Sequence, residues 1–165
     1  MAAEADVLDE LRRLRARVPG LTGALAATVD GLVVAHDTPG LEPETVAALT
    51  ATALGVALRT TDLTGRGGFR ELLVRGTNGY VATYAAGRTA VLTLFAQDRV
   101  NVGRLHLEGR RAGARVGELV DAGATLAPPA TGGSPPPAAG PAPIRTRTTR
   151  APRGTTADAR TATDI

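Results

Sequence analysis

The sequence predicts a mixed α/β fold of the α+β type, in which a five-stranded antiparallel sheet is covered by helices on both faces. Two dipeptides carry much of this prediction. Asp30-Gly31 and Asn78-Gly79 each separate two apolar runs, which is typical of a tight hairpin turn. In addition, segments with helical apolar spacing stand before, between and after the hairpins. Strands joined by hairpins pair in antiparallel fashion, so the helices are left to cover the faces of the sheet.

The predicted order is helix, two strands, helix, three strands, helix. The expected elements are a helix over 6–18, strands over 21–29 and 32–36, a helix over 44–63, strands over 69–75, 80–85 and 88–96, and a helix over 100–122. Pro19-Gly20 ends the first helix, Pro43 suits the first turn of the second, and Asn101 is a candidate N-cap of the third. Neither face of the 80–85 strand is strongly polar, which favours cover on both faces.

The composition removes most catalytic chemistry. All 19 basic residues are Arg, and the chain has no Lys and no Cys. A Walker A lysine, a Schiff base, a thiolate nucleophile and a thiolate metal site are therefore excluded. His36, His106 and Ser134 are the only His and Ser residues, which is too few for a His-rich zinc site or a Ser-His-Asp triad. We expect no enzyme, no catalytic residue, no metal and no cofactor, with both histidines as ordinary side chains.

The net charge of +3 belongs to one end of the chain. Residues 1–126 hold 14 Arg and 14 acidic residues, whereas 127–165 hold five Arg and two Asp. A neutral body with 2% aromatic residues disfavours nucleic-acid binding. The longest nearly apolar stretch, 46–58, is shorter than the roughly 20 residues of a membrane-spanning helix. The acidic start is unlike a secretory signal, so we expect no membrane span and a cytoplasmic location.

The composition changes sharply near residue 127. Eight of the 11 prolines follow this point, and Ile144 and Ile165 are the only apolar residues there larger than Ala. Such a segment buries too little apolar area to offset its conformational entropy. We therefore expect a folded domain over 1–126 and a disordered Pro/Arg/Thr-rich tail over 127–165. The tail is either a solvated end, a docking segment for a further signalling protein, or a phosphorylation target at Thr148 or Thr149.

The helix over 44–63 lacks a polar face. Nothing between Val46 and Leu58 is charged, and Leu49 and Leu54 sit about 140° apart around the helix axis. A helix that is apolar nearly all round is buried on both sides, and a single sheet covers only one of them. The other side packs either within the monomer or on a second subunit, although an Ala-rich genome would produce a similar composition. Gly55 in mid-helix favours close approach of a partner, so we expect self-association.

The ordered pattern as a whole resembles the Roadblock domain family (dynein light chain roadblock-type), from about Val7 to Ala122. The resemblance is carried by LDELRRLRARVPGL, TVDGLVVA, VAALTATALGVAL and RELLVRGTNGYVATYAAGRTAVLTLFA, the last followed by a final helix. The chain is most similar to the prokaryotic members that are associated with small Ras-like GTPases. Its long Pro- and Arg-rich tail departs from the family pattern.

The resemblance implies a homodimer, in which the second helices of two subunits pack together and the third strands pair edge to edge. On this chain the implied interface comprises Val46, Ala47, Leu49, Ala51, Leu54, Gly55 and Leu58 of the helix, with Glu71 and Leu73 of the strand. It also implies a non-enzymatic regulator that binds a small Ras-like GTPase and modulates its nucleotide state. The alternative is a structural adaptor that tethers partner proteins without altering GTP turnover.

A glycine series marks the last helix. Gly109, Gly113 and Gly117 are spaced at four residues, and arginines interrupt the series. The arginines argue against a membrane dimer, so the spacing predicts close packing of this helix on the sheet.

The loop at 65–68 combines three glycines with Arg66. It follows a helix, whereas a phosphate-binding P-loop follows a strand, so we expect a connector. An arginine finger from Arg66, Arg70 or Arg99 is conceivable in a GTPase regulator, but the resemblance argues against one.

Overall fold

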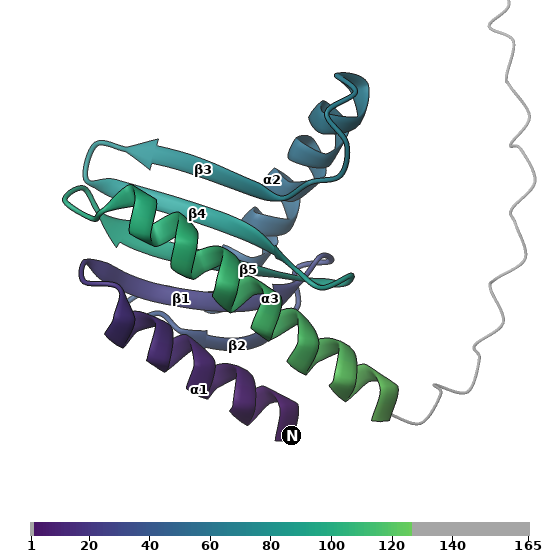
Figure 1. Ribbon diagram of the computed structural model, residues 1–165, viewed down its shortest axis with the longest axis horizontal. Helices are drawn as coiled ribbons and strands as arrows, with labels where there is room; N and C mark the ends of the chain where they lie inside the picture. The colour runs from purple at the N-terminus through teal and green to yellow at the C-terminus, as the bar shows by residue number, and fades with distance from the viewer. Residues whose placement is uncertain (1, 127–165) are drawn as a thin grey trace, which may run out of the picture. The chain divides into compact units, whose positions relative to one another are not determined.

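The computed structural model describes residues 2–126 and contains the predicted elements in the predicted order (Figure 1). They are α1 (Ala2–Arg17), β1 (Leu21–Thr28), β2 (Val33–Asp37), α2 (Pro43–Leu63), β3 (Glu71–Gly76), β4 (Gly79–Ala86), β5 (Ala90–Gln97) and α3 (Val102–Leu126). The terminal helices are longer than predicted because their outer turns hold few large apolar side chains, which periodicity does not detect. The predicted tail over 127–165 lies outside the described residues.

The five strands form one antiparallel sheet in the order β2-β1-β5-β4-β3. β5 lies in the middle and is buried over nearly its whole length, as expected for a strand with helices on both faces. It joins the two hairpins by pairing with β1 on one side and β4 on the other. β2 and β3 are the edges of the sheet, so each has one side that no described strand covers.

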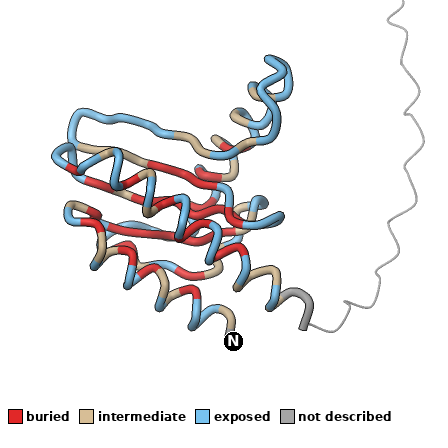
Figure 2. Tube along the Cα trace, in the orientation of Figure 1, coloured by how far each residue is buried: buried red, intermediate tan, exposed pale blue. Residues whose placement is uncertain are grey.

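Two helices cover one face of the sheet and a single helix covers the other (Figure 1). Under α1 and α3 lies the larger core, whose biggest fully buried side chains include Leu11, Leu14, Tyr84, Leu92, Leu94 and Leu105. Under α2 lies a smaller cluster, made by Leu25, Ala27, Ala47, Leu54 and Val91. Figure 2 shows the same difference between the two faces, since most of β3 and of the C-terminal end of α2 is coloured as exposed. The face under α2 is therefore the less completely covered one.

Both hairpin signals mark turns, although one turn is displaced by a residue. Gly31 lies at the tip of the β1–β2 hairpin with φ of 87°, a backbone conformation that other residues rarely adopt. In the β3–β4 hairpin, Gly76 pairs with Gly79, so residues 77 and 78 form the loop and Gly79 begins β4. A Cβ on Gly79 would overlap the carbonyl oxygen of Ala96, so close approach of β5 explains this glycine.

The glycine series holds α3 close to β4, which confirms the predicted helix–sheet packing. A Cβ on Gly109 would overlap the ring of Tyr84, and one on Gly117 would overlap the backbone at Gly87. At Gly113, a Cβ would lie 2.9 Å from the carbonyl oxygen of Ala85, which is closer than van der Waals contact allows. Larger residues at these positions would push the helix away from the sheet.

α2 and α3 begin with the residues that the sequence predicted for their first turn and N-cap. Pro43 occupies the first turn of α2, where its missing N–H costs no helical hydrogen bond. Asn101 caps α3, because its side-chain oxygen accepts a hydrogen bond of 2.9 Å from the backbone N–H of Arg104.

Candidate interaction surface

α2 carries one covered and one uncovered apolar stripe. Ala47, Thr50 and Leu54 are buried against the chain's own sheet, and Leu54 is only 4% exposed. On another side of the helix Leu49, Val56 and Leu63 are 66%, 64% and 89% exposed. These three residues are spaced at seven, so they lie along nearly the same line of the helix. We call them the outer stripe; in the described chain nothing shields it from water.

The predicted interface residues of α2 lie partly on its exposed side and partly on the side that the sheet covers. Leu49, Gly55 and Leu58 are exposed, Val46 and Ala51 are half-buried, and Ala47 and Leu54 are buried under the helix. Ala47 and Leu54 thus belong to the packing of α2 on its own sheet rather than to its accessible surface. The sequence left open which side of α2 faces outward, because both sides are apolar.

An apolar groove lies beside α2, which packs mainly over β1 and β2 and leaves β3 and β4 less covered. The groove is lined by Val46, Leu49, Thr50 and Ala53 of α2 and by Leu72, Val74, Val81, Thr83 and Phe95 of the sheet. Its cavity volume is about 250 Å³. The groove connects the helix surface with the exposed edge of the sheet, so the two form one continuous apolar region.

Three threonines link α2 to the sheet beneath this groove. The Oγ1 atom of Thr93 lies 3.1 Å from that of Thr83 and 3.4 Å from that of Thr50, and all three side chains are buried. The hydroxyls satisfy one another, which removes the cost of burying them in an apolar cluster. Sequence reasoning missed this link, and its one signal was a Thr at position 50 within an otherwise apolar stripe.

β3 is a short edge strand with apolar side chains on both faces. It pairs with β4 from Glu71 to Gly76, and its outer edge meets no described strand. Leu72 and Val74 line the groove beside α2, and Val74 is 50% exposed. Leu73 lies opposite Ala82, which is part of the core under α3. An exposed edge of this kind is a surface on which a further strand can pair.

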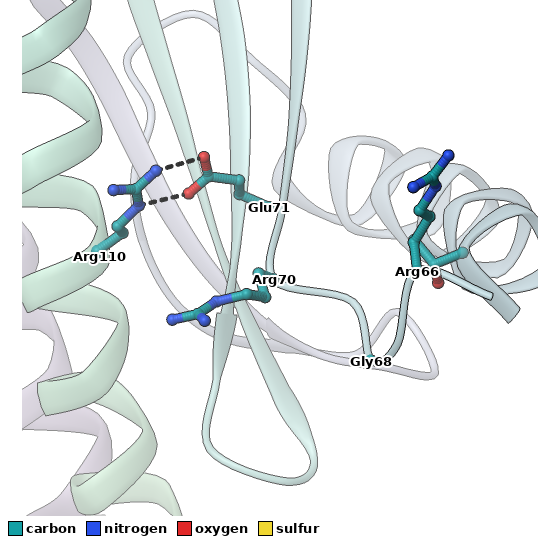
Figure 3. A pocket seen from close by; sticks show the side chains of 6 residues that line it. Arg66, Gly68, Arg70, Glu71 and Arg110 are labelled. Carbon is teal, nitrogen blue, oxygen red and sulfur yellow. Dashed lines mark hydrogen bonds and ion pairs between the residues drawn. The ribbon is translucent and has the colours of Figure 1, made fainter. Parts of the chain in front are cut away.

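Glu71 faces α3 rather than α2. Arg110 of α3 donates two hydrogen bonds of 2.7 Å to its two carboxylate oxygens (Figure 3), and these bonds lower the pKa of Glu71. The Nδ1 atom of His106 lies 3.6 Å from Oε1 of Glu71 and 3.1 Å from the hydroxyl of Tyr84. Burial raises the pKa of Tyr84. Both implied interface residues on β3, Glu71 and Leu73, therefore lie on the side of the sheet that α3 covers.

A polar recess opens where the C-terminal end of α2, the next loop, β3 and α3 meet (Figure 3). It has a volume of about 530 Å³ and is lined by Thr61, Arg66, Gly68, Arg70, Glu71 and Arg110. Of the three arginines considered as fingers, Arg66 and Arg70 line this recess and Arg99 does not.

Among the residues that the structure describes, no group of three or more His, Asp or Glu side chains is placed to hold a metal ion. His36 approaches the hydroxyl of Thr38 at 3.2 Å, and His106 approaches that of Tyr84. None of the helices over 2–126 has the length and apolar character needed to cross a membrane. The notable features of this surface are therefore the outer stripe, the groove, the β3 edge and the recess.

Known proteins share this fold. The uncharacterized protein MJ0714 of Methanocaldococcus jannaschii is 30% identical over 101 residues, which cover 61% of this chain and 85% of that protein. The gliding protein MglB from Thermus thermophilus has a TM-score of 0.67 at 22% identity, covering 74% of this chain and 93% of that one. The Roadblock/LC7 domain from Streptomyces avermitilis has a TM-score of 0.64 at 22% identity, covering 69% and 97%. At 22% identity, the similarity to these two structures shows that the fold is shared.

The antiparallel five-stranded sheet between one helix and two, with the helix–hairpin–helix–meander–helix order, is thus a fold that this chain shares with a Roadblock/LC7 domain. The chain belongs to the Roadblock/LC7 domain family, whose model matches residues 7–96. The matched segment runs from α1 to the end of β5, and α3 follows it. The family predicted from the sequence pattern is thereby confirmed.

Proposed function

We propose that this chain is a non-catalytic, cytoplasmic homodimer that binds a small Ras-like GTPase and regulates its nucleotide state. The observation that carries the proposal is the uncovered outer stripe of α2 beside the open β3 edge, in a chain of the Roadblock/LC7 family. Members of this family are generally non-catalytic regulators. The absence of Lys and Cys agrees with a role in binding rather than in covalent catalysis.

The proposed dimer joins the outer stripe, the groove and the β3 edge of one subunit to the same features of its partner. A two-fold axis brings identical patches together, so a self-complementary apolar surface favours a dimer. Pairing of two β3 edges would also satisfy the backbone groups that the single chain leaves to water. Without a partner, the three large apolar side chains of the outer stripe would stay exposed to water, which is costly and favours aggregation.

The proposed partner is a GTPase because the chain resembles the prokaryotic family members that are associated with small Ras-like GTPases. Such GTPases change the conformation of their switch segments with the bound nucleotide. A regulator must bind one nucleotide state better than the other, since equal affinity shifts no equilibrium. We expect tighter binding to the GTP form, by roughly 1–3 kcal/mol, through the dimer body near α2 and its flanking loops. The five tail arginines would add a weak, salt-sensitive contribution.

The experiment begins with a pull-down on the full chain, followed by mass spectrometry to identify the bound GTPase. Calorimetry then compares this GTPase loaded with GDP and with a non-hydrolysable GTP analogue, and hydrolysis and exchange are measured with and without the chain. The control titrates each nucleotide into the chain alone, where we expect no heat of binding.

Two outcomes would change the proposal. Equal affinities with unchanged hydrolysis and exchange would favour the structural adaptor, which tethers partners without altering GTP turnover. Failure to bind any co-purified GTPase would remove the regulator from consideration altogether.

A further inference from the structure

The polar recess is a cationic site built from distant parts of the chain. Arg66 and Arg70 come from the loop after α2, whereas Arg110 comes from the middle of α3 (Figure 3). Among the described residues that line it, Glu71 is the only acidic one, so the lining holds three arginines and one carboxylate. This excess of positive charge is local to the recess, because the sequence from 1 to 126 holds equal numbers of Arg and acidic residues.

Two of the three guanidinium groups are available to a ligand. Arg110 is engaged, because two of its nitrogen atoms donate hydrogen bonds of 2.7 Å to Glu71. Arg66 and Arg70 are exposed, and neither forms an ion pair or side-chain hydrogen bond with a residue in the described part of the chain. Glu71 acts on Arg70 only through a longer-range electrostatic interaction. The Glu71–Arg110 pair thus neutralises itself and leaves two cations beside it.

The loop that carries these arginines also presents its backbone. Gly65 and Gly67 have positive φ, and a Cβ added at Gly65, Gly67 or Gly68 would meet nothing within 4 Å. The amides of Gly67 and Gly68 donate no hydrogen bond to any described residue. Open backbone N–H groups next to cations are suited to bind negatively charged oxygen atoms.

The arrangement fits an elongated ligand better than one small anion. Figure 3 shows that Arg66 and Arg70 lie on either side of Gly68, with their guanidinium groups directed away from each other. They cannot grip a single phosphate from two sides, and the Glu71 carboxylate would repel a dianion placed between them. A second, smaller recess of about 290 Å³ adjoins this one and shares Arg70, Glu71 and Arg110 with it. Phe69 and Ala114 help to line it and give it apolar surface.

We propose that this recess docks an acidic segment of a partner protein, with separate carboxylates on Arg66 and Arg70 and the side chain that follows on the Arg70 side in the smaller recess. Charge complementarity selects the partner, and bidentate guanidinium–carboxylate pairs fix its register. The proposal requires neither that the chain be a dimer nor that the partner be a GTPase.

The test uses the full chain and a fluorescein-labelled peptide of alternating Glu and Ala, with binding followed by fluorescence anisotropy at low salt. The double variant Arg66→Glu/Arg70→Glu is compared with Arg13→Glu/Arg104→Glu. The control arginines are also exposed and form no ion pair within the described residues, and both doubles change the net charge equally. We expect the first double to lose at least about tenfold in affinity and the control to stay within about twofold. Equal losses would show non-specific charge attraction, including attraction by the tail, and would overturn the proposal.

A second readout locates the peptide and separates it from small anions. In amide NMR spectra of the labelled full chain, the peptide should shift the signals of Gly67 and Gly68 but not that of Gly40, which is another exposed glycine with positive φ. Inorganic phosphate at the same concentration should neither reproduce these shifts nor displace the peptide. Displacement by phosphate would make the recess a small-anion site and overturn the peptide proposal.

Circular dichroism and light scattering of both double variants check that any loss of peptide binding does not come from unfolding or from a changed oligomeric state. If the charge reversal prevents folding, the single variants Arg66→Gln and Arg70→Gln replace it. Each should then weaken peptide binding relative to Arg104→Gln, and unchanged affinity in both would contradict the proposal.

Discussion

Glu71 connects three elements through one carboxylate. It lies at the start of the edge strand β3, receives two hydrogen bonds from Arg110 of α3, and approaches His106, which in turn meets Tyr84 of β4. The hydrogen bonds with Arg110 lower the pKa of Glu71. Because β4 is the one described strand that pairs with β3, the pair with Arg110 adds a second link, a tether between β3 and α3.

The tether should make stability depend on pH in an acidic window. Since the folded pKa of Glu71 lies below its ordinary value of about 4.3, its ion pair stabilises the fold above that pH and is lost as the pH falls through the folded pKa. Glu71→Gln should therefore unfold at lower urea than wild type at pH 7, and the difference should shrink as the pH falls through the folded pKa.

The matched control for this prediction is Glu118→Gln. Glu118 pairs with Arg115 within one exposed helix at three residues' spacing, so it tethers no second element. It should change the urea midpoint little at pH 7 and in acid. A difference between Glu71→Gln and wild type that stays constant over the whole acidic range in which the domain folds would contradict the role given to the carboxylate.

Gly109 shows how one missing methyl group sets the distance between α3 and the sheet. Alanine normally stabilises a helix interior by about 1 kcal/mol relative to glycine. At this position its Cβ would overlap the buried Tyr84 ring, and overpacking of that kind costs roughly 1–3 kcal/mol. We expect Gly109→Ala to lower the free energy of unfolding by about 1 kcal/mol, measured by urea denaturation.

Gly103→Ala in the same helix is the comparison. A Cβ there comes no closer than 3.4 Å to another heavy atom, so the substitution should be neutral or slightly stabilising. If Gly109→Ala stabilised the protein as well, the helix would have room to move and the glycine series would not fix its position.

At the scale of elements, α2 is the part whose two sides differ most in surroundings. Its inner side is held by the chain's own sheet and by the threonine link, whereas its outer stripe is open. The same chemical change on the two sides should therefore have different consequences, one for folding and one for assembly.

Leu54→Arg places a charge in the packed cluster under α2, where no partner is available. We expect it to cost about 3–5 kcal/mol and to unfold much of the protein. Leu49→Arg adds a charge at a position that is 66% exposed in the single chain, so the domain should stay folded and the proposed dimer should dissociate. Circular dichroism and light scattering at micromolar concentration distinguish the two results.

Leu107→Arg is the matched control, since Leu107 is 49% exposed but lies on α3, on the opposite face of the sheet. It should leave both the fold and the oligomeric state unchanged. A wild-type chain that is monomeric at micromolar concentration would show that the outer stripe does not mediate self-association.

At the scale of the whole molecule, the folded part and the Pro-rich part should contribute very unequally to stability. Residues beyond 126 include only two apolar side chains larger than Ala. A chain that ends at Leu126 should therefore melt within about 2 °C of the full chain in calorimetry. A chain that ends at Glu118 should melt at a clearly lower temperature, because it loses Leu119 and Val120, which pack against the larger core. A drop of many degrees at the first truncation would mean that the tail packs on the domain.

The sequence by itself determined the order of the elements, both hairpins, the cap at Asn101 and the close packing of α3. These features depend on local chemistry: a turn needs a glycine near its tip, a cap needs a side-chain acceptor, and a close contact needs a missing Cβ. The two-sided character of α2 was also readable, because it is a property of one helix alone.

The tertiary structure decided which side of each element faces which neighbour. On α2, the sheet covers Ala47 and Leu54 and leaves Leu49 open, although periodicity makes the two sides equally apolar. On β3, Glu71 and Leu73 turn toward α3 while Leu72 and Val74 border the groove, a choice that alternation permits in either sense. The recess joins Arg66 and Arg70 to Arg110, about forty residues further along the chain. Periodicity defines faces, but only packing between distant segments assigns a neighbour to each face.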